Sequence, residues 1–377
     1  MNPHKIQDVE VTPVQVPLGQ EFQGSHYVMT HRCAIITKVV TEDGLVGEIY
    51  NGDDMANLAD IVRLIRRILA PLVIGRDIFE VSVLWHAMME TSTSDILSDR
   101  RIGLQAVACV ESAIFDAMGK AVGLPLHRLW GARHQRLPVM VIGGYYPPGR
   151  TGKTDERAIG AEIDQYRSLD INACKFKVGG RSPEIDAERV SIARQAAGDE
   201  FQIAVDANQG WTREEALRFV ELTQALNILW FEEPCKWTYD KAAMRDLRMK
   251  TNIPITAGQS ELSAAGCIEL MTSGAIDICN FDASWSGGSH AWLRVARAAE
   301  ALGLRMAHHE EAQISAQLLG SVATSTFVEV FLPERDPIFY GLIANRHRFE
   351  QGYYAIPQGP GWGVEVDHDF VARYRLD

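Results

Sequence analysis

The stretch ACKFKVGGRSPEIDAERVSIARQAAGDEFQIAVDAN, residues 173–208, contains one full repeat of the pattern that decides the fold. It begins with a short β-rich run, continues through a helical stretch from Pro183 to Ala197, and ends with a second β-rich run from Phe201 to Val205. Short apolar runs that alternate with helical stretches are typical of parallel strands joined by helices. We therefore predict a strand–helix–strand unit here.

The same alternation extends from about Pro138 to residue 330. The candidate strands are Val139–Ile142, Ala173–Val178, Phe201–Val205, Leu229–Phe231, Ile253–Ala257, Ile276–Phe281, Arg305–Ala307 and Phe327–Val330, and further helical stretches are Thr212–Ala225 and Gly288–Leu302. Eight such strands favour a β/α barrel over a six-stranded doubly wound sheet. No G-x-G-x-x-G motif follows a strand to support a dinucleotide-binding fold.

The first third of the chain has a different pattern, with strands first and helices after them. The β-rich runs are Val9–Val16, Ala34–Val40 and Leu45–Ile49, and the helical stretches are Asn57–Leu72, Phe79–Glu90 and Arg101–Val122. This order predicts a small α+β domain. We expect three parts: an α+β domain (residues 1–130), a barrel (131–350), and a segment (351–377) that returns to the first domain.

Composition excludes several classes of protein. The 377 residues are 46% hydrophobic, and 49 acidic side chains against 37 Lys and Arg give a net charge of -12. This apolar content excludes a disordered chain, and the acidic balance argues against duplex DNA or anionic lipid as a partner. The start lacks a signal-peptide pattern and no long uncharged apolar run is present, so we expect a cytoplasmic protein without a membrane span. The six cysteines form no C-x-x-C pair and are interpreted as structural thiols.

Polar side chains end every candidate strand from the second to the eighth. They are Lys175 and Lys177, Asp206 and Asn208, Glu232 and Glu233, Gln259 and Glu261, Asp282, His308 and His309, and Glu329. In a barrel the C-terminal strand ends meet at one mouth, where catalytic groups lie. Any one of these residues could be an ordinary solvated side chain, but the whole series indicates an active site.

Three of these positions suggest a metal ion. Asp206, Glu232 and a third acid near 259–261 would bring carboxylates together from adjacent strands, where they repel one another unless a cation is bound. Oxygen ligands without cysteine favour Mg²⁺, or Mn²⁺, over zinc. The alternative is that each acid is solvated or paired with Arg or Lys.

Two further pairs are candidates for proton transfer. Lys175 and Lys177 are one residue apart on a strand and point to the same face, where each would lower the pKa of the other and favour a neutral base. His309 lies one strand beyond Asp282, so the two can form a dyad in which the carboxylate fixes the imidazole tautomer. His308 could line the site or point into the barrel wall.

With these motifs in place, the chain resembles the mandelate racemase subgroup of the enolase superfamily over essentially its full length. The motifs are Ala173-Cys-Lys-Phe-Lys-Val-Gly179, Val205-Asp-Ala-Asn208, Trp230-Phe-Glu-Glu-Pro234, Phe281-Asp-Ala-Ser-Trp-Ser-Gly-Gly288, His309 with Ile314-Ser-Ala-Gln-Leu-Leu319, and Asp116-Ala-Met-Gly-Lys-Ala-Val-Gly-Leu-Pro-Leu126. The resemblance implies a modified (β/α)₇β barrel, a modified TIM barrel, covered by an N-terminal α+β capping domain. It also implies a homo-oligomer of unspecified size.

The resemblance further implies roles for the site residues. Asp206 and Glu232 match metal ligands, usually for Mg²⁺. Lys177 matches the base on one face of the substrate, and Lys175 the lysine that assists it and contacts the substrate carboxylate. His309 with Asp282 matches the acid or base on the opposite face, and Glu329 the acid that hydrogen-bonds the enediolate.

One position departs from the family pattern. The family has Gly-Glu at the end of the fifth strand, and this chain has Gly258-Gln259. Either Gln259 coordinates through its amide oxygen, or Glu261, on the same side if the strand continues, replaces it, or the site has lost metal binding. We favour Glu261, because a hard dication gains more from a third carboxylate.

The implied shared step is abstraction of the proton α to a carboxylate, and two outcomes stay open. Reprotonation from the other face gives a racemase or epimerase of a 2-hydroxy acid, whereas loss of a β-hydroxyl gives a 2-keto-3-deoxy acid. The polar segment 19–27 with His26, together with Tyr146, Asn208, Gln259 and His308, suits a polyhydroxylated substrate, although an exposed hairpin and an aromatic packing patch would look the same. We predict an acid-sugar dehydratase of carbohydrate acid catabolism; the alternatives are the racemase and a non-catalytic carboxylate-binding protein.

Overall fold

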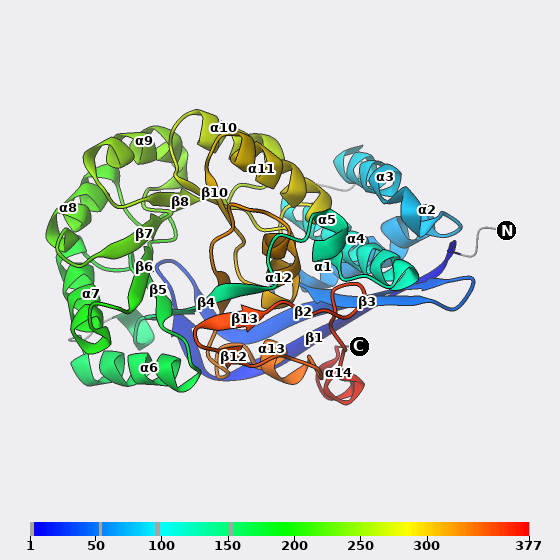
Figure 1. The fold of residues 1–377 in the computed structure, drawn as a ribbon, viewed down its shortest axis with the longest axis horizontal. Helices are drawn as coiled ribbons and strands as arrows, with labels where there is room; N and C mark the ends of the chain where they lie inside the picture. Colours follow the sequence, from blue (N-terminus) through cyan, green and yellow to red (C-terminus); the bar gives the residue numbers. More distant parts are fainter. Residues whose placement is uncertain (1–3, 53–54, 95–98, 151–153, 377) are drawn as a thin grey trace.

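The computed structural model describes residues 4–52, 55–94, 99–150 and 154–376. The chain forms an N-terminal domain of strands and helices beside a larger α/β barrel-like domain (Figure 1). The three predicted β-rich runs of the first domain form an antiparallel sheet in the order β1-β2-β3. These strands are β1 (Ile6–Gln23), β2 (Val28–Thr41) and β3 (Val46–Asn51), longer than predicted.

Helices pack against this sheet to complete the capping domain. They are α1 (Leu58–Leu64) and α2 (Ala70–Val73), joined by a π-helical turn (Ile65–Leu69), then α3 (Val81–Ser94), α4 (Arg100–Val122) and α5 (Leu126–Trp130). The side chain of Asp99 caps the N-terminus of α4, and Gly123 ends the helix in the left-handed conformation at φ 69°. Helix α4 is long and apolar enough to cross a membrane, but it lies mostly buried in the protein core.

All eight predicted barrel strands are present. They are β4 (Arg136–Gly143), β5 (Ala173–Lys177), β6 (Gln202–Asp206), β7 (Ile228–Glu232), β8 (Ile255–Ala257), β9 (Ile278–Asn280), β10 (Arg305–Ala307) and β11 (Val328–Val330). They pair in parallel in the order β10-β9-β8-β7-β6-β5-β4-β11. A single bridge from Met306 to Ser325 links β10 to the segment before β11.

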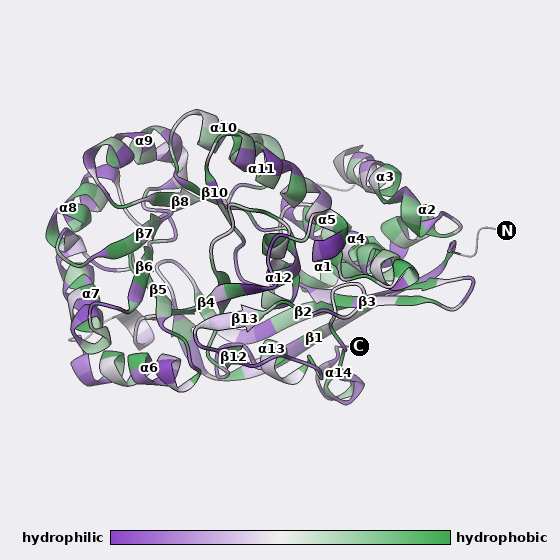
Figure 2. Cartoon of the chain, in the orientation of Figure 1, coloured by the Kyte–Doolittle hydropathy of each residue, from purple (hydrophilic) through white to green (hydrophobic). Residues whose placement is uncertain are grey.

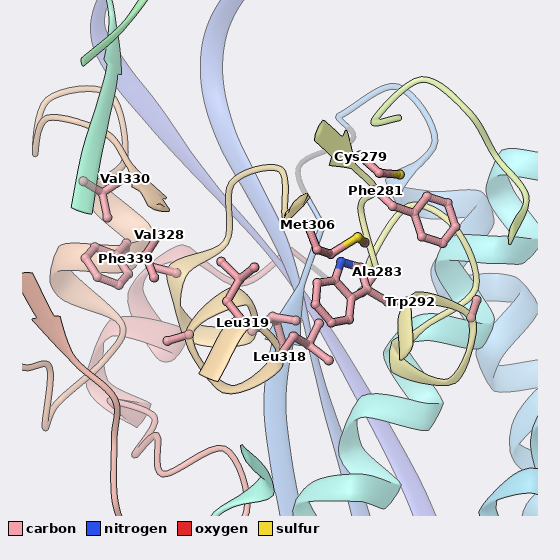
Figure 3. Packing of buried hydrophobic residues seen from close by; sticks show 14 of the residues in the cluster. Cys279, Phe281, Ala283, Trp292, Met306, Leu318, Leu319, Val328, Val330 and Phe339 are labelled. Atoms are coloured by element: carbon pink, nitrogen blue, oxygen red, sulfur yellow. The ribbon is translucent and has the colours of Figure 1, made fainter. Parts of the chain in front are cut away.

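Helices follow the barrel strands and cover their outer side (Figure 1). They are α6 (Glu156–Ser168), α7 (Pro183–Ala197), α8 (Arg213–Thr223), α9 (Asp240–Lys250), α10 (Ala264–Thr272), α11 (Ser289–Ala301) and α12 (Ala312–Gly320). Hydrophilic residues lie on their outer faces and hydrophobic residues on the strands, as Figure 2 shows. In this layer Trp292 of α11 packs near Met306 and Leu318 (Figure 3), so that α11 and α12 are joined to the barrel wall by apolar contacts. The short helix α13 (Pro337–Gly341) contacts strands β1 and β2 of the capping domain.

The C-terminal segment contacts both domains. Strands β12 (Phe349–Glu350) and β13 (Tyr353–Ala355) form a hairpin that pairs antiparallel with the start of β4, and α14 (His368–Tyr374) follows. Between them, the backbone N–H of Trp362 donates to Asp116 of α4 at 2.9 Å, and its indole N–H donates to the Ser112 carbonyl at 2.8 Å. The predicted return to the capping domain therefore occurs through Trp362, while β13 extends the barrel sheet.

Candidate active site

The site is built on the side chains that point into the barrel. An inner layer of apolar side chains consists of Met140, Ala173, Ala204, Trp230, Ile278 and Ala307, with Phe327 packed against it. Because a strand alternates its faces, the residue two positions further on points the same way. At that level lie Lys175, Asp206, Glu232, Asn280, His309 and Glu329. A charged layer therefore follows the apolar layer toward the C-terminal strand ends.

Lys175 lies at the centre of this layer. Its ammonium group donates to Glu232 Oε1 at 2.7 Å and to Glu329 Oε1 at 2.6 Å, and all three side chains are buried. Glu232 also accepts hydrogen bonds from Asn280 and from the Trp230 indole. The predicted residues of β5, β7 and β11 are thus brought together.

Lys177 lies one level closer to the mouth. It donates to Asp206 Oδ2 at 2.7 Å and to Asn208 Oδ1 at 3.0 Å. Asn208 has a positive φ of 43°, and its backbone N–H donates to Asp206 Oδ1 at 2.8 Å, so the turn after β6 fixes that carboxylate. The predicted cluster of Lys177, Asp206 and Asn208 is present.

Lys177 lowers the pKa of Lys175 as predicted, but the expected net lowering that would favour a neutral base is wrong for this arrangement. Burial lowers the pKa of Lys175, but Glu232 and Glu329 overcome that effect and hold it above its ordinary value. For Lys177, burial is likewise outweighed by Asp206, and the pKa is raised. Each ammonium group has a carboxylate partner closer than the other lysine, so attraction exceeds repulsion.

The carboxylates carry more negative charge than the two lysines offset. Burial, together with the charges of Asp206 and Glu329, raises the pKa of Glu232 to about 7 against the opposing effect of Lys175. Burial and Asp206 also raise the pKa of Glu233. Carboxylates that are buried and crowded in this way suit a divalent cation that takes oxygen ligands.

The side chain at the third ligand position, Gln259, has an oxygen atom that such a cation could bind. Gln259 is 4% exposed, and its Nε2 donates to Glu233 Oε2 at 3.1 Å. Its amide oxygen Oε1 is buried and accepts no hydrogen bond from the described residues. Within the described ranges no group of three His, Cys, Asp or Glu side chains is arranged for a metal ion. The unpartnered Gln259 oxygen is therefore the atom at this strand end that could bind a cation together with the carboxylates of Asp206 and Glu232.

Glu261, which we favoured as the third ligand, points elsewhere. Strand β8 ends at Ala257, and Gly258 turns the chain at φ 144°, so the condition that the strand continues is not met. The charged neighbours that act on the Glu261 carboxylate are Lys241, Asp240 and Glu269, on the helices outside the strands. The structure therefore favours Gln259 over Glu261.

His309 and Asp282 form the predicted dyad. The His309 Nδ1 to Asp282 Oδ2 distance is 2.9 Å, and both side chains are buried. The backbone N–H of Trp285 donates to Asp282 Oδ1, and the Trp285 ring lies 4.8 Å from the imidazole. Four strands, β6 to β9, separate β10 from β5 on one side, and β11 and β4 separate them on the side that the Met306–Ser325 bridge links, so the dyad lies across the mouth from Lys177.

Three predicted substrate contacts are not brought to the site. His308 points into the barrel wall, where its Nε2 accepts from the Ala283 N–H at 3.1 Å. Tyr146 donates its hydroxyl to Asp186 at 2.7 Å and is committed to that contact. His26 is exposed at the tip of the β1–β2 hairpin.

Their sequence neighbours face the site instead. The Tyr27 ring centroid lies 5.8 Å from Lys177 Nζ. The Tyr145 hydroxyl is buried without a hydrogen-bond partner among the described residues, and Tyr27, Lys177 and Glu310 act on its ionisation. Two tyrosines are adjacent in the sequence Gly143-Gly-Tyr-Tyr146, and we predicted Tyr146 as the contact. Period-two reasoning does not extend into a loop, so the sequence could not decide which tyrosine faces inward.

Two acids of the site were assigned no individual role from the sequence, although Glu233 was among the strand-end side chains. Glu233 accepts a hydrogen bond from Gln259 and lines a cleft of about 920 Å³. Met89 and Leu104 of the capping domain line the same cleft. Glu310 directly follows His309 and bonds its ring, as described below. The charged run His308-His-Glu-Glu311 at a strand end was the signal that could have identified Glu310.

Comparisons with known proteins agree with this geometry. Residues 6–131 match the family model of the mandelate racemase/muconate lactonizing enzyme N-terminal domain, and residues 158–370 match the model described as enolase C-terminal domain-like. An arabinonate dehydratase from Saccharolobus solfataricus is 28% identical over 90% of each chain. At 25–26% identity, relatives over most of both chains include a D-galactarolactone cycloisomerase from Agrobacterium fabrum and an N-succinyl-L-Arg/Lys racemase from Bacillus cereus.

Solved structures are more similar. A crystal structure of a mandelate racemase/muconate lactonizing enzyme is 45% identical, with a TM-score of 0.94 over 99% of this chain and 100% of that one. Another from a marine actinobacterium, in complex with magnesium, is 43% identical with a TM-score of 0.91 over 99% of both chains. This chain therefore belongs to the mandelate racemase/muconate lactonizing enzyme family of the enolase superfamily.

Proposed function

We propose that this protein removes the proton α to a carboxylate and then eliminates water from an acid sugar. The observation that carries the proposal is the position of two proton-transfer groups, Lys177 and the His309–Asp282 dyad, on opposite sides of one buried mouth. A substrate carbon held between them has a base on one face and an acid on the other.

The residues between these groups support stabilisation of an enediolate. Lys175 and Glu329 are hydrogen-bonded to each other at 2.6 Å at the centre of the mouth. Lys175 offers positive charge to the substrate carboxylate, and Glu329 in its protonated form can donate to the developing oxyanion. Donors that are fixed before the reaction stabilise such charge without reorganisation.

Asp206, Glu232 and the Gln259 amide oxygen are the proposed ligands of Mg²⁺, with Mn²⁺ as a possible replacement. When bound, the ion would polarise the substrate carboxylate and offset the negative charge of Asp206 and Glu232 that holds a proton on Lys177. The side chain of Asn208, already bonded to Lys177, would keep that amine oriented toward the α-proton.

The polar groups around the mouth support an acid sugar as the substrate class. The Tyr145 hydroxyl, Asn208 and Glu310 offer donors and acceptors to hydroxyl groups. The arabinonate dehydratase from Saccharolobus solfataricus is a dehydratase by its name, which agrees with loss of a β-hydroxyl. The proposed product is a 2-keto-3-deoxy acid.

Racemisation or epimerisation of a 2-hydroxy acid is the second candidate. It is favoured by the same pair of opposed groups, because one of them could take the α-proton from one face of the substrate while the other, in its protonated form, gives a proton to the opposite face of the enediolate. The N-succinyl-L-Arg/Lys racemase from Bacillus cereus is a relative of this reaction type.

One assay separates the two reactions. The protein with Mg²⁺ is incubated with mono- and diacid sugars, 2-keto acids are trapped as semicarbazones, and α-proton exchange is followed in D₂O by NMR. Keto acid formation is expected. Exchange without keto acid would support the racemase, and the absence of both signals without Mg²⁺ binding would contradict both reactions.

A site variant tests the base assignment. Lys177→Ala should lose turnover by at least about 100-fold, since general base catalysis contributes about that much or more. Lys250→Ala, which removes an exposed amine of α9, is the matched control and should keep normal turnover. Normal turnover in Lys177→Ala would show that the base is another group.

A further inference from the structure

Glu310 places a second carboxylate on the ring of His309. Its Oε1 lies 3.2 Å from His309 Nε2, the nitrogen opposite the one that Asp282 bonds. Glu310 is 9% exposed and has a positive φ of 52°, a conformation that costs energy for a residue with a side chain. The turn after β10 thus holds this side chain against the imidazole.

The second carboxylate oxygen and the backbone N–H of Glu310 also have hydrogen-bond partners. Its Oε2 accepts from Arg32 at 3.1 Å, and Arg32, on strand β2 of the capping domain, also pairs with Asp336. The Glu310 backbone N–H donates to Glu329 Oε2 at 3.0 Å. Glu310 therefore links the dyad, the central Glu329 and the capping domain.

The charges around His309 favour its protonated form. Asp282 and Glu310 bond its two nitrogens, and Glu233 faces it from the end of β7. The opposing groups are His308 beside it in the chain and Arg32 behind Glu310. Burial lowers the pKa of His309, but Glu310 and Asp282 outweigh burial and raise that pKa well above its ordinary value.

We propose that Glu310 is a positioning residue that keeps His309 as an imidazolium, so that His309 enters the reaction as an acid and not as a second base. A substrate hydroxyl that binds at Nε2 would take the place of Glu310 Oε1. The carboxylate remains beside Arg32 and continues to favour the positive ring through its charge. This proposal rests on the proposed dehydration and assigns the role of the acid in that reaction to His309.

The proton balance follows from this arrangement. Lys177 takes the α-proton, and the electron pair of that C–H bond forms the enediolate. The enediolate electrons form the Cα–Cβ double bond as the β-carbon–oxygen bond breaks. The leaving oxygen takes the Nε2 proton of His309 and departs as water, which leaves neutral His309 and the enol of the 2-keto-3-deoxy acid.

The direct test measures the pKa of His309 in the free protein. The full chain is labelled with ¹³C at histidine Cε1 and titrated by NMR, and His309→Asn identifies the His309 signal among the 11 histidines. In Glu310→Gln the His309 pKa should fall by about one unit or more, since an opposite charge at this distance shifts a pKa by about 1–3 units. Glu350→Gln, which changes an exposed side chain of strand β12, is the control and should leave the His309 pKa unchanged.

If Glu310→Gln does not fold by circular dichroism, Glu310→Asp replaces it. This variant keeps the charge and draws it back from the ring, so a smaller fall in the His309 pKa is expected. An unchanged His309 pKa in the folded variant would overturn the proposal. No substrate is present in this titration, so its failure is distinct from failure of the proposed reaction.

A kinetic readout separates positioning from simple substrate binding. In Glu310→Gln the alkaline limb of the kcat/KM profile should move to lower pH by the same shift as the NMR pKa. The ratio of dehydration to α-proton exchange should fall at neutral pH. A raised KM with an unmoved alkaline limb would show that Glu310 only binds substrate, and would also overturn the proposal.

Discussion

Gln259 shows how one side chain changes the chemistry of a shared site. An amide oxygen binds a cation without adding charge, whereas a carboxylate would add one more negative charge beside Glu233, whose pKa burial and Asp206 already raise. Its Nε2 is bonded to Glu233, which turns Oε1 away from that acid. A glutamine at this position therefore relieves crowding among the acids, and in the proposed metal site it would still offer an oxygen ligand.

The ligand assignment can be tested by calorimetric titration with Mg²⁺. Gln259→Leu should weaken Mg²⁺ binding by at least about tenfold. Substituting a residue that only supports a metal ligand already weakens metal binding by about 10–100-fold, and a ligand itself should matter at least as much. Glu261→Gln is the matched control, because that acid faces Lys241 and Asp240. Weaker binding in Glu261→Gln with normal binding in Gln259→Leu would reverse the assignment.

Asp282 should control the orientation and charge of His309. Asp282→Asn removes the negative charge at 2.9 Å from Nδ1. The pKa of His309 should fall, because the ring loses a group that raises it. Turnover should fall by about 10²–10⁴-fold, the range of general acid catalysis, and activity should be lost at a lower pH than in the parent protein. A steady-state pH profile measures both effects, and an unshifted alkaline limb would contradict the dyad.

At the scale of secondary-structure elements, the sequence predicts the site residues whose direction is set by the alternation of side chains along a strand. On β5, β6, β7 and β11 the inner apolar residue is followed two positions later by Lys175, Asp206, Glu232 and Glu329, so the period of two identifies the site. On β8 the inner residue is Thr256, and the same step reaches Gly258, which has no side chain. The proposed third ligand, Gln259, thus lies in a turn, where periodicity gives no information, and Glu310 was missed for the same reason.

The turn at Gly258 should therefore be sensitive to substitution. A Cβ there would lie 3.0 Å from the Asn280 backbone at a positive φ of 144°. Gly258→Ala should destabilise the protein by about 1–3 kcal/mol and weaken Mg²⁺ binding by moving Gln259. Gly303→Ala shares a positive φ but meets nothing within 4 Å, so it should lose some stability without losing Mg²⁺ affinity. Urea denaturation and calorimetry measure the two effects, and equal Mg²⁺ affinity in both variants would contradict the role of the turn.

The contact between α4 and α11 should make stability depend on pH. Glu111 of α4 accepts from the Ser289 and His290 N–H groups, and burial raises its pKa from 4.5 to about 8. Between these values the folded state holds a proton that the unfolded state releases, so stability should fall as pH rises, by at most about 1.4 kcal/mol per unit. Urea denaturation of the parent protein and Glu111→Gln at several pH values tests this. In Glu111→Gln the fall of stability with rising pH should be absent. Parallel plots of stability against pH for the two proteins would contradict the role of Glu111.

At the scale of the whole molecule, neither domain holds the complete site. The barrel provides the charged layer, while the capping domain provides Tyr27 beside Lys177 and Arg32 beside Glu310. The net charge of -12 disfavours an anionic substrate at long range. Lys175, Lys177 and the proposed cation must therefore outweigh it locally, within the roughly 10 Å over which charges act at ordinary ionic strength.

The most direct measurement of the central proposal is α-proton exchange in D₂O. The protein with Mg²⁺ is incubated with a panel of aldonic and aldaric acids, and the α-proton signal is followed by ¹H NMR for the parent protein and Lys177→Ala. We predict loss of the α-proton signal for at least one acid with the parent protein, and no loss above background with the variant. Undiminished exchange in Lys177→Ala, or no exchange with any acid by a Mg²⁺-bound parent protein, would contradict it.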